Sequence, residues 1–287
     1  MEYVLTIGIL LCIYVILVLS ANLTVGMANL LTMCQAAFYG LGAYIGTIFL
    51  MQFHLPFLFV ALSVMLMTGA MSLVVSLVSV KLKGDYFILG TLGFQMVVYT
   101  LLRNWKGPIG FLDVPKIRLL GLVDMSNIYV EFLFTLLVTL LVIWFFYKIQ
   151  KSPFGRILRA IREDEISAQS LGCDTTRLKV RSFFLSAAFA GLAGLLLASF
   201  QGLVKPDNFS LDCSIAILAA LFIGGVGNRV WGPILGAAVV VVLPEMLRFF
   251  GLPEAEAAYL HQIIYGVALV VLMFLRPQGL LGDVKLK

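Results

Sequence analysis

The sequence predicts an all-α protein, a polytopic bundle of transmembrane helices in a single domain over residues 1–287. Hydrophobic residues make up 61% of the chain and charged residues 12%, whereas soluble domains are about half apolar and about a quarter charged. The mean hydropathy of +1.05 therefore places the chain in the membrane class. The long apolar runs lack the strand-like alternation of an outer-membrane barrel, which leaves a helical bundle.

The apolar runs set the expected membrane segments, because a spanning helix needs about 20 residues. The long runs are Tyr3–Ser20, Pro56–Val80, Tyr86–Leu102, Ile128–Tyr147, Ser182–Phe200, Trp231–Leu247 and Tyr259–Leu275. The run 213–226 is shorter and would span only about 21 Å as a helix. Glycines at its end predict a broken helix near the middle of the membrane. We expect about eight to ten membrane segments, some of them short or broken.

The stretch from Asn22 to Met51 is too long for one straight helix, since 30 residues would extend about 45 Å. Polar and small residues interrupt it. Two short half-helices would give about ten segments and a cytoplasmic N-terminus. A single crossing would instead place the N-terminus outside.

Basic residues set the orientation of the bundle. Lys and Arg concentrate in the loop of residues 149–181, which the positive-inside rule places in the cytoplasm. The C-terminal tail, with Arg276, Lys285 and Lys287, is basic as well, so we also expect it in the cytoplasm. Counting back from the loop makes the segment 103–127 external.

The cytoplasmic loop contains an amphipathic pattern from Pro153 to Gly172 that predicts one helix. Apolar residues recur at helical spacing, Ser152 and Pro153 suit its start, and Gly172 suits its end. The other faces carry Arg156, Arg159, Arg162, Glu163 and Asp164. Such a helix either lies on the inner leaflet or docks on a cytoplasmic protein. Three consecutive acids favour docking.

The same loop resembles the coupling motif of ATP-binding-cassette (ABC) importer permeases, whose general form is Glu-Ala-Ala, three residues, then Gly. Ser167-Ala168 and Gly172 fit this spacing, while the glutamate is displaced by one place to Glu165. The resemblance implies that this helix seats on a separate ATPase.

Further stretches resemble the permeases of branched-chain amino acid ABC transporters, of the LivM type, over about residues 20–282. They are Gly84–Phe87, Thr91–Phe94, Ser152–Arg156 running into Ala160–Glu165, Gly224–Gly227, Trp231–Pro233 and Arg276–Leu280. The family implies a bacterial inner-membrane complex with a second homologous permease, two cytoplasmic ATPases and an external solute-binding protein. It implies branched-chain amino acids as substrates; urea, short amides or another small solute are the alternatives.

The residues of the chain agree with a complex in which a separate subunit hydrolyses the ATP. The chain has no Gly-Lys dipeptide and hence no phosphate-binding loop, so ATP must be used by a partner and no cofactor is expected. The sequence contains neither metal-ligand spacing nor a nucleophile elbow, so it does not indicate an enzyme. It also gives no indication of nucleic-acid binding. The alternative class is an ion-coupled secondary carrier, which usually keeps acidic residues deep in its bundle. The membrane runs of this chain contain few ionisable residues, which argues against that class.

Four polar residues in apolar surroundings are candidates for the translocation pathway. Thr91 and Gln95 share one helix face at i and i+4, and Asn29 and Gln35 lie in the interrupted stretch. Unsatisfied polar groups rarely face lipid. We expect these side chains to face the bundle interior and to line or brace a route shared with the partner permease. The alternative is that they only bridge helices by hydrogen bonds.

Overall fold

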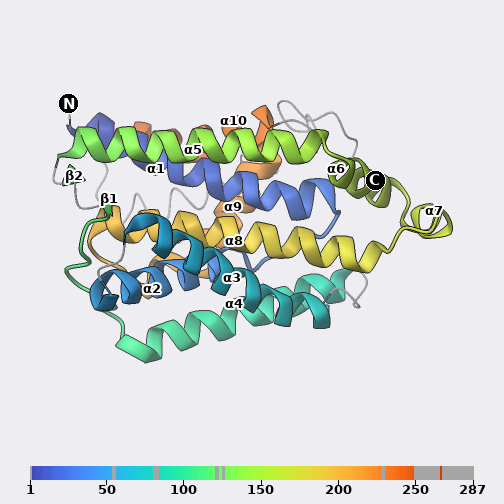
Figure 1. Cartoon of the computed structure of the whole chain (residues 1–287), viewed down its shortest axis with the longest axis horizontal. Coiled ribbons are helices and arrows are strands. Elements are labelled where there is room, and N and C mark those ends of the chain that lie inside the picture. Colours follow the sequence, from blue (N-terminus) through green and yellow to red (C-terminus); the bar gives the residue numbers. More distant parts are fainter. Residues whose placement is uncertain are drawn as a thin grey trace.

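The computed structural model describes residues 2–53, 56–79, 84–119, 123–124, 127–227, 230–248 and 266. Its long helices lie side by side along one axis (Figure 1). They are α1 (Glu2–Ala21), α2 (Gln35–Phe53), α3 (Phe57–Ser79), α4 (Asp85–Lys106), α5 (Ile128–Lys151) and α8 (Thr175–Gln201). Two further apolar helices, α9 (Leu211–Gly224) and α10 (Trp231–Arg248), pack against each other and against α1. The short elements are η1 (Asn22–Met27), α6 (Pro153–Glu163), α7 (Glu165–Ser170), η2 (Pro206–Phe209), β1 (Arg118–Leu119) and β2 (Val123–Asp124).

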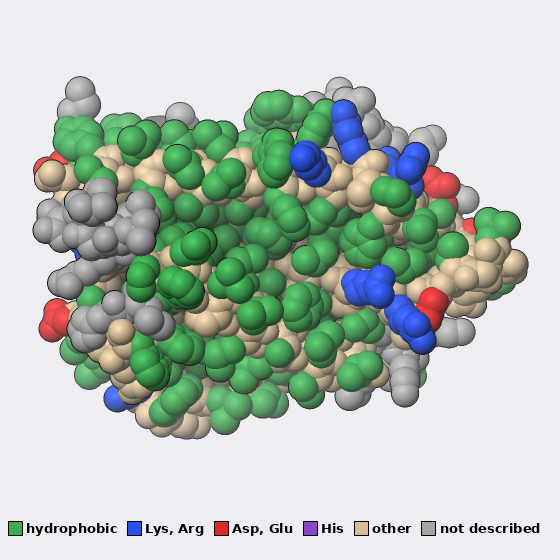
Figure 2. Space-filling model, in the orientation of Figure 1, with side chains coloured by type: hydrophobic (Ala, Val, Ile, Leu, Met, Phe, Trp, Pro, Cys, Tyr) green, Lys and Arg blue, Asp and Glu red, His purple; other side chains and the backbone are tan. Residues whose placement is uncertain are grey.

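The predicted fold class is confirmed. Within the described part of the chain, 6 helices are long and apolar enough to cross a membrane, and α9 and α10 add two shorter apolar helices. On the face seen in Figure 2, hydrophobic side chains cover most of the described surface, and the charged side chains lie toward its two ends. The expected span 259–275, apart from residue 266, and the basic tail lie outside the described residues. The same is true of Lys81 and Lys83, which the positive-inside rule places in the cytoplasm.

The bundle has two distinct ends. Helices α6 and α7 project from one end, and the start of α1 and the β1–β2 hairpin lie at the other (Figure 1). The expected external segment 103–127 is thus opposite the expected cytoplasmic loop. The prediction that the N-terminus shares a side with that loop is wrong, and the single-crossing alternative holds.

The reason is the path of residues 22–53. Asn22–Met27 is a π-helix that prolongs α1, and Gln35–Phe53 is one helix, so the stretch is not a pair of half-helices. Asn29 adopts φ +55, a left-handed conformation that asparagine tolerates better than most residues. The chain turns back there, and Gln35 reaches Ser20 at 2.6 Å.

Helix α8 lies at the centre of the bundle and packs on α1, α2 and α3. Its contact with α2 depends on glycine. A Cβ at Gly42 would lie 2.2 Å from the carbonyl oxygen of Gly191, and a Cβ at Gly194 would lie 2.1 Å from that of Tyr39. Small residues let membrane helices approach closely where the hydrophobic effect cannot drive them together.

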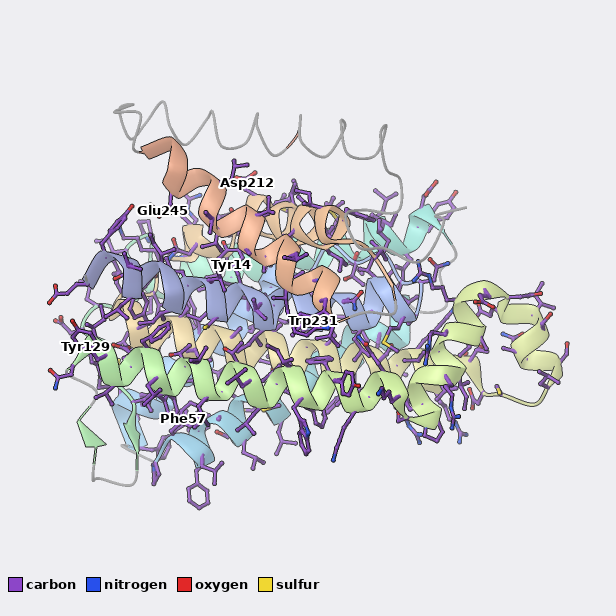
Figure 3. All side chains as sticks on the ribbon, turned by 90° about the horizontal axis from the view of Figure 1, so that it is seen from above. Tyr14, Phe57, Tyr129, Asp212, Trp231 and Glu245 are labelled. Carbon is purple, nitrogen blue, oxygen red and sulfur yellow. The ribbon has the colours of Figure 1, made fainter. Side chains whose placement is uncertain are left out.

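The glycine-rich break after the short apolar run is also as predicted. α9 ends at Gly224, and Gly225 and Gly227 have positive φ values of 110 and 137, which the absence of a Cβ permits. The Asn22 side chain bonds both backbone groups of Gly227, donating to the carbonyl at 3.2 Å and accepting from the amide at 3.4 Å. α10 then returns from Trp231 towards Glu245 at the end where Tyr129 lies (Figure 3).

Candidate functional site

The loop expected to couple to an ATPase folds as two helices. Ser152 accepts a hydrogen bond from the Gly155 amide at 3.3 Å and Pro153 opens α6, so the predicted start is confirmed. The prediction of one continuous helix to Gly172 is wrong, because Asp164 is extended at φ −153 and ψ 106. Its carboxylate accepts from the amides of Ile166 and Ser167 at 2.9 and 3.1 Å and thereby caps α7.

Helix α6 buries its apolar stripe against its own chain. Leu158 and Ile161 are buried, and α6 contacts α5, α8 and η1. A Cβ at Gly155 would lie 2.4 Å from the carbonyl oxygen of Ile149, which shows how closely α6 meets the end of α5. The stripe therefore holds α6 on the bundle rather than forming a free docking face.

Two of the loop arginines also bond inside the chain. Arg159 donates to the carbonyl oxygens of Gln150, at 2.8 Å, and Gly155, at 3.3 Å, so it satisfies carbonyls at the end of α5. The half-buried Arg162 donates to the carbonyl oxygen of Gly26 in η1. Burial lowers the pKa of the Arg162 guanidinium, which stays charged. Arg162 thus ties the loop to the π-helix that ends the first membrane crossing.

The segment of α7, unlike α6, exposes large apolar side chains. Ile166 is 77% exposed and Leu171 is 85% exposed at the tip of the loop, while Ala168 is buried. Lys179 on α8 pairs with Glu165 at 2.7 Å and holds α7 in place. Gly172 ends the turn at φ +84, where a side chain would be strained. Ile166 and Leu171 are the large apolar side chains that this loop exposes between Pro153 and Asp174, and exposed apolar side chains that form a patch can mark a protein contact.

The remaining charged residues of the loop stay at its surface. Arg156, Glu163 and Asp164 are exposed. Hydrogen bonds from Ser167 and Ile166 hold the pKa of the Asp164 carboxyl below its usual value. The carboxylate is therefore ionised, and the cap of α7 is complete, at neutral pH.

Three of the four predicted pathway residues lie in a buried polar cluster. Gln35 donates to Ser20 and Ser186, Thr91 accepts from the Met33 amide at 3.1 Å, and Gln95 donates to the Phe209 carbonyl at 2.8 Å. All of these groups surround the start of α2, where backbone amides have no helical partner. The cluster closes the break between α1 and α2.

The fourth predicted residue is separate from this cluster. Asn29 is exposed, and its left-handed backbone accounts for its position at the turn. The sequence reasoning missed Asn22, Ser186 and Ser214, which complete the polar contacts across α1, α8 and α9. The bonds to Gly227, Ala36 and Ser20 each join residues more than 150 positions apart, and helical spacing within one segment cannot reveal such pairs.

Residues 3–273 match the family described as "Branched-chain amino acid transport system / permease component". The chain belongs to this family of membrane transport subunits. It is 34% identical to the high-affinity branched-chain amino acid permease protein LivM of Salmonella typhimurium, over 94% of this chain and 68% of the relative. The LivM protein of Escherichia coli gives the same identity and coverage.

The family extends to a second type of permease. A probable branched-chain amino acid permease protein LivH of Methanocaldococcus jannaschii is 24% identical over 93% of this chain and 88% of its own length. No solved structure matches the chain. The family and the apolar helices establish a multi-pass membrane protein that acts as a permease subunit of an ABC transport system.

Proposed function

We propose that this permease imports branched-chain amino acids, Leu, Ile and Val, using ATP hydrolysed by a separate subunit. The names of its LivM relatives support the substrate. The observation that supports ATP coupling is the loop, with two exposed apolar side chains, Ile166 on α7 and Leu171 directly after it, and a bond from α6 to η1. The complex contains a second homologous permease, two ATPases and an external solute-binding protein.

In this proposal α7 seats in a cleft of the ATPase through Ile166 and Leu171. α6 transmits the movement because Arg159 fixes it to α5 and Arg162 fixes it to η1. From η1 the contact continues through Asn22 to the glycine break after α9. The moving part is thus the broken region of α1, α2 and α9, where non-helical backbone is held by side chains rather than by a helix.

The same proposal sets the orientation and the route. α6, α7 and the C-terminus face the bacterial cytoplasm, and the hairpin end faces outside, as the basic loop requires. Gln35, Thr91 and Gln95 brace the start of α2 beside the route, since their polar groups have partners within the chain. The route itself lies between this chain and the second permease.

The docking step is tested by charge placed on the tip of the loop. Ile166→Asp and Leu171→Asp should abolish co-purification with the ATPase while the chain still inserts into the membrane. Arg177→Ala is the control, because that side chain lies on the same end and forms only an exposed pair with Asp174. Unchanged co-purification in both aspartate variants would reject α7 as the docking surface.

The substrate is tested on the external solute-binding protein, which selects the solute in this arrangement. Leu, Ile and Val should raise its melting temperature. Stabilisation by urea or a short amide, without a response to amino acids, would show that the proposed substrate is wrong. It would not contradict the proposal that the chain belongs to an ATP-driven importer.

A further inference from the structure

A pocket lies outside the coupling contacts, where the end of α3, the start of α6 and the start of α8 meet. Its volume is about 460 Å³, and it is lined by Leu73, Phe154, Val180, Arg181, Phe184 and Leu185. This volume falls in the range of about 300–1,000 Å³ that is typical of small-molecule sites. The pocket opens on the side of the bundle near the α6–α7 end.

The lining of the pocket is apolar, although an arginine belongs to it. The wall of the pocket contains no polar atom, so Arg181 contributes only its methylene groups to the wall, and its guanidinium lies outside the pocket. Among the described residues, none pairs with the Arg181 guanidinium. Two acids close to the start of α8 are paired with other basic residues, Asp174 with Arg177 and Glu165 with Lys179. The mouth of the pocket therefore offers a free positive charge.

Neighbouring side chains place this mouth at the level of the lipid headgroups. On α5, Lys148 lies 3.9 Å above the ring of Trp144, and Lys151 lies 4.3 Å above that of Tyr147. Both rings are exposed, and exposed Trp and Tyr mark the membrane–water interface. Phe154 follows three residues later in the chain and lines the pocket. Basic groups flank the hydrophobic surface at this end of Figure 2.

We infer that this pocket binds an anionic phospholipid of the cytoplasmic leaflet, with an acyl chain between α3 and α8 and the phosphate on Arg181. An apolar wall with a cation at its mouth matches such a lipid in both chemistry and charge. The cytoplasmic leaflet carries the negative lipids. A lipid here also touches Phe154 in the first turn of α6, and so lies against the base of the coupling loop.

The inference is tested on the intact transporter in membranes that contain a phosphatidylglycerol with a diazirine on its acyl chain. After irradiation, peptide mass spectrometry should locate the label on pocket residues such as Leu73 and Leu185. A matched phosphatidylcholine probe should label them about five-fold less, since one basic residue near the surface contributes an attraction of about that size.

Variants separate the headgroup from the acyl chain. Arg181→Ala should remove the preference for phosphatidylglycerol, and Arg181→Lys should retain it because the charge remains. Leu185→Trp should lower labelling by both probes, because the larger ring fills the pocket. Arg177→Ala, which changes a charge one turn away that is already paired, should leave labelling unchanged.

Two outcomes would overturn the inference. Equal labelling by the two probes in the unmodified protein, or a preference that survives Arg181→Ala, would show that no anionic headgroup is recognised. Absence of label from the pocket, together with cross-linking of Leu185 to the second permease, would identify the pocket as a contact between subunits. Neither outcome would affect the proposed import of amino acids, which does not depend on this pocket.

Discussion

Arg162 provides the sharpest test of how the loop is joined to the membrane bundle. Its guanidinium donates to the carbonyl oxygen of Gly26, and η1 is buried throughout. Arg162→Ala removes the donor and leaves that carbonyl without its partner. A hydrogen bond to a charged group contributes about 1.5–3 kcal/mol. Since about 1.4 kcal/mol is a factor of ten, the seated arrangement of α6 on η1 should be disfavoured by about 10- to 100-fold.

The expected result is uncoupling. Arg162→Ala should lower the amount of solute imported per ATP hydrolysed by about ten-fold or more, whereas the ATPase should still co-purify because the tip of α7 is unchanged. Arg162→Lys should restore part of the coupling, since the ammonium keeps the charge but not the fork geometry. Arg177→Ala is the control for a lost charge on the same side of the protein.

The refuting result is equally specific. If Arg162→Ala abolishes co-purification of the ATPase while Arg177→Ala does not, Arg162 is a docking residue, as the sequence alone first indicated. If uptake and ATP hydrolysis both stay normal, the bond to Gly26 carries no movement and α6 must act through α5 alone.

Three further predictions concern stability. Gly42→Ala should destabilise the α2–α8 contact by about 1–3 kcal/mol, because its Cβ would lie 2.2 Å from a backbone oxygen, and Gly93→Ala, with open space around it, should leave the melting temperature unchanged. Lys116→Met should lower the melting temperature, because it strips the partner at 3.0 Å from the buried Glu131 carboxylate; an unchanged value would contradict this pairing. Folding lowers the pKa of Asp164, so its carboxylate should cap α7 at every pH above the ordinary pKa of 3.8, and the cap should be lost as the pH falls through the lower folded value. At neutral pH, Asp164→Ala should speed amide exchange in α7, whereas Asp164→Asn should not, because asparagine can still accept the capping hydrogen bonds.

The sequence was sufficient for the features that depend on composition and local chemistry. Apolar length predicted the bundle, basic residues predicted the separate loop, Ser152 marked the start of α6, and Gly172 marked the turn after α7. Turn glycines likewise predicted the break after α9. Each of these is set by a few adjacent residues.

The remaining features depend on contacts between distant segments. The break at Asp164 was missed because the amphipathic pattern continues through it. Only the structure shows that the backbone of Asp164 is extended and that its carboxylate caps α7. Arg162 looked like a docking charge because its partner, Gly26, is 136 residues away. The path of residues 22–53 was misjudged for the same reason, since the groups that close the break come from α4, α8 and α9.

We expect this permease to move amino acids only as part of an ATP-driven complex. The most direct measurement is accumulation of radiolabelled leucine in proteoliposomes that contain the chain, the second permease, the ATPase and the binding protein. Uptake should require ATP and fall to background when the ATPase is inactive or omitted. Accumulation of leucine by the chain alone, driven by a proton or sodium gradient, would contradict the claim and identify a secondary carrier.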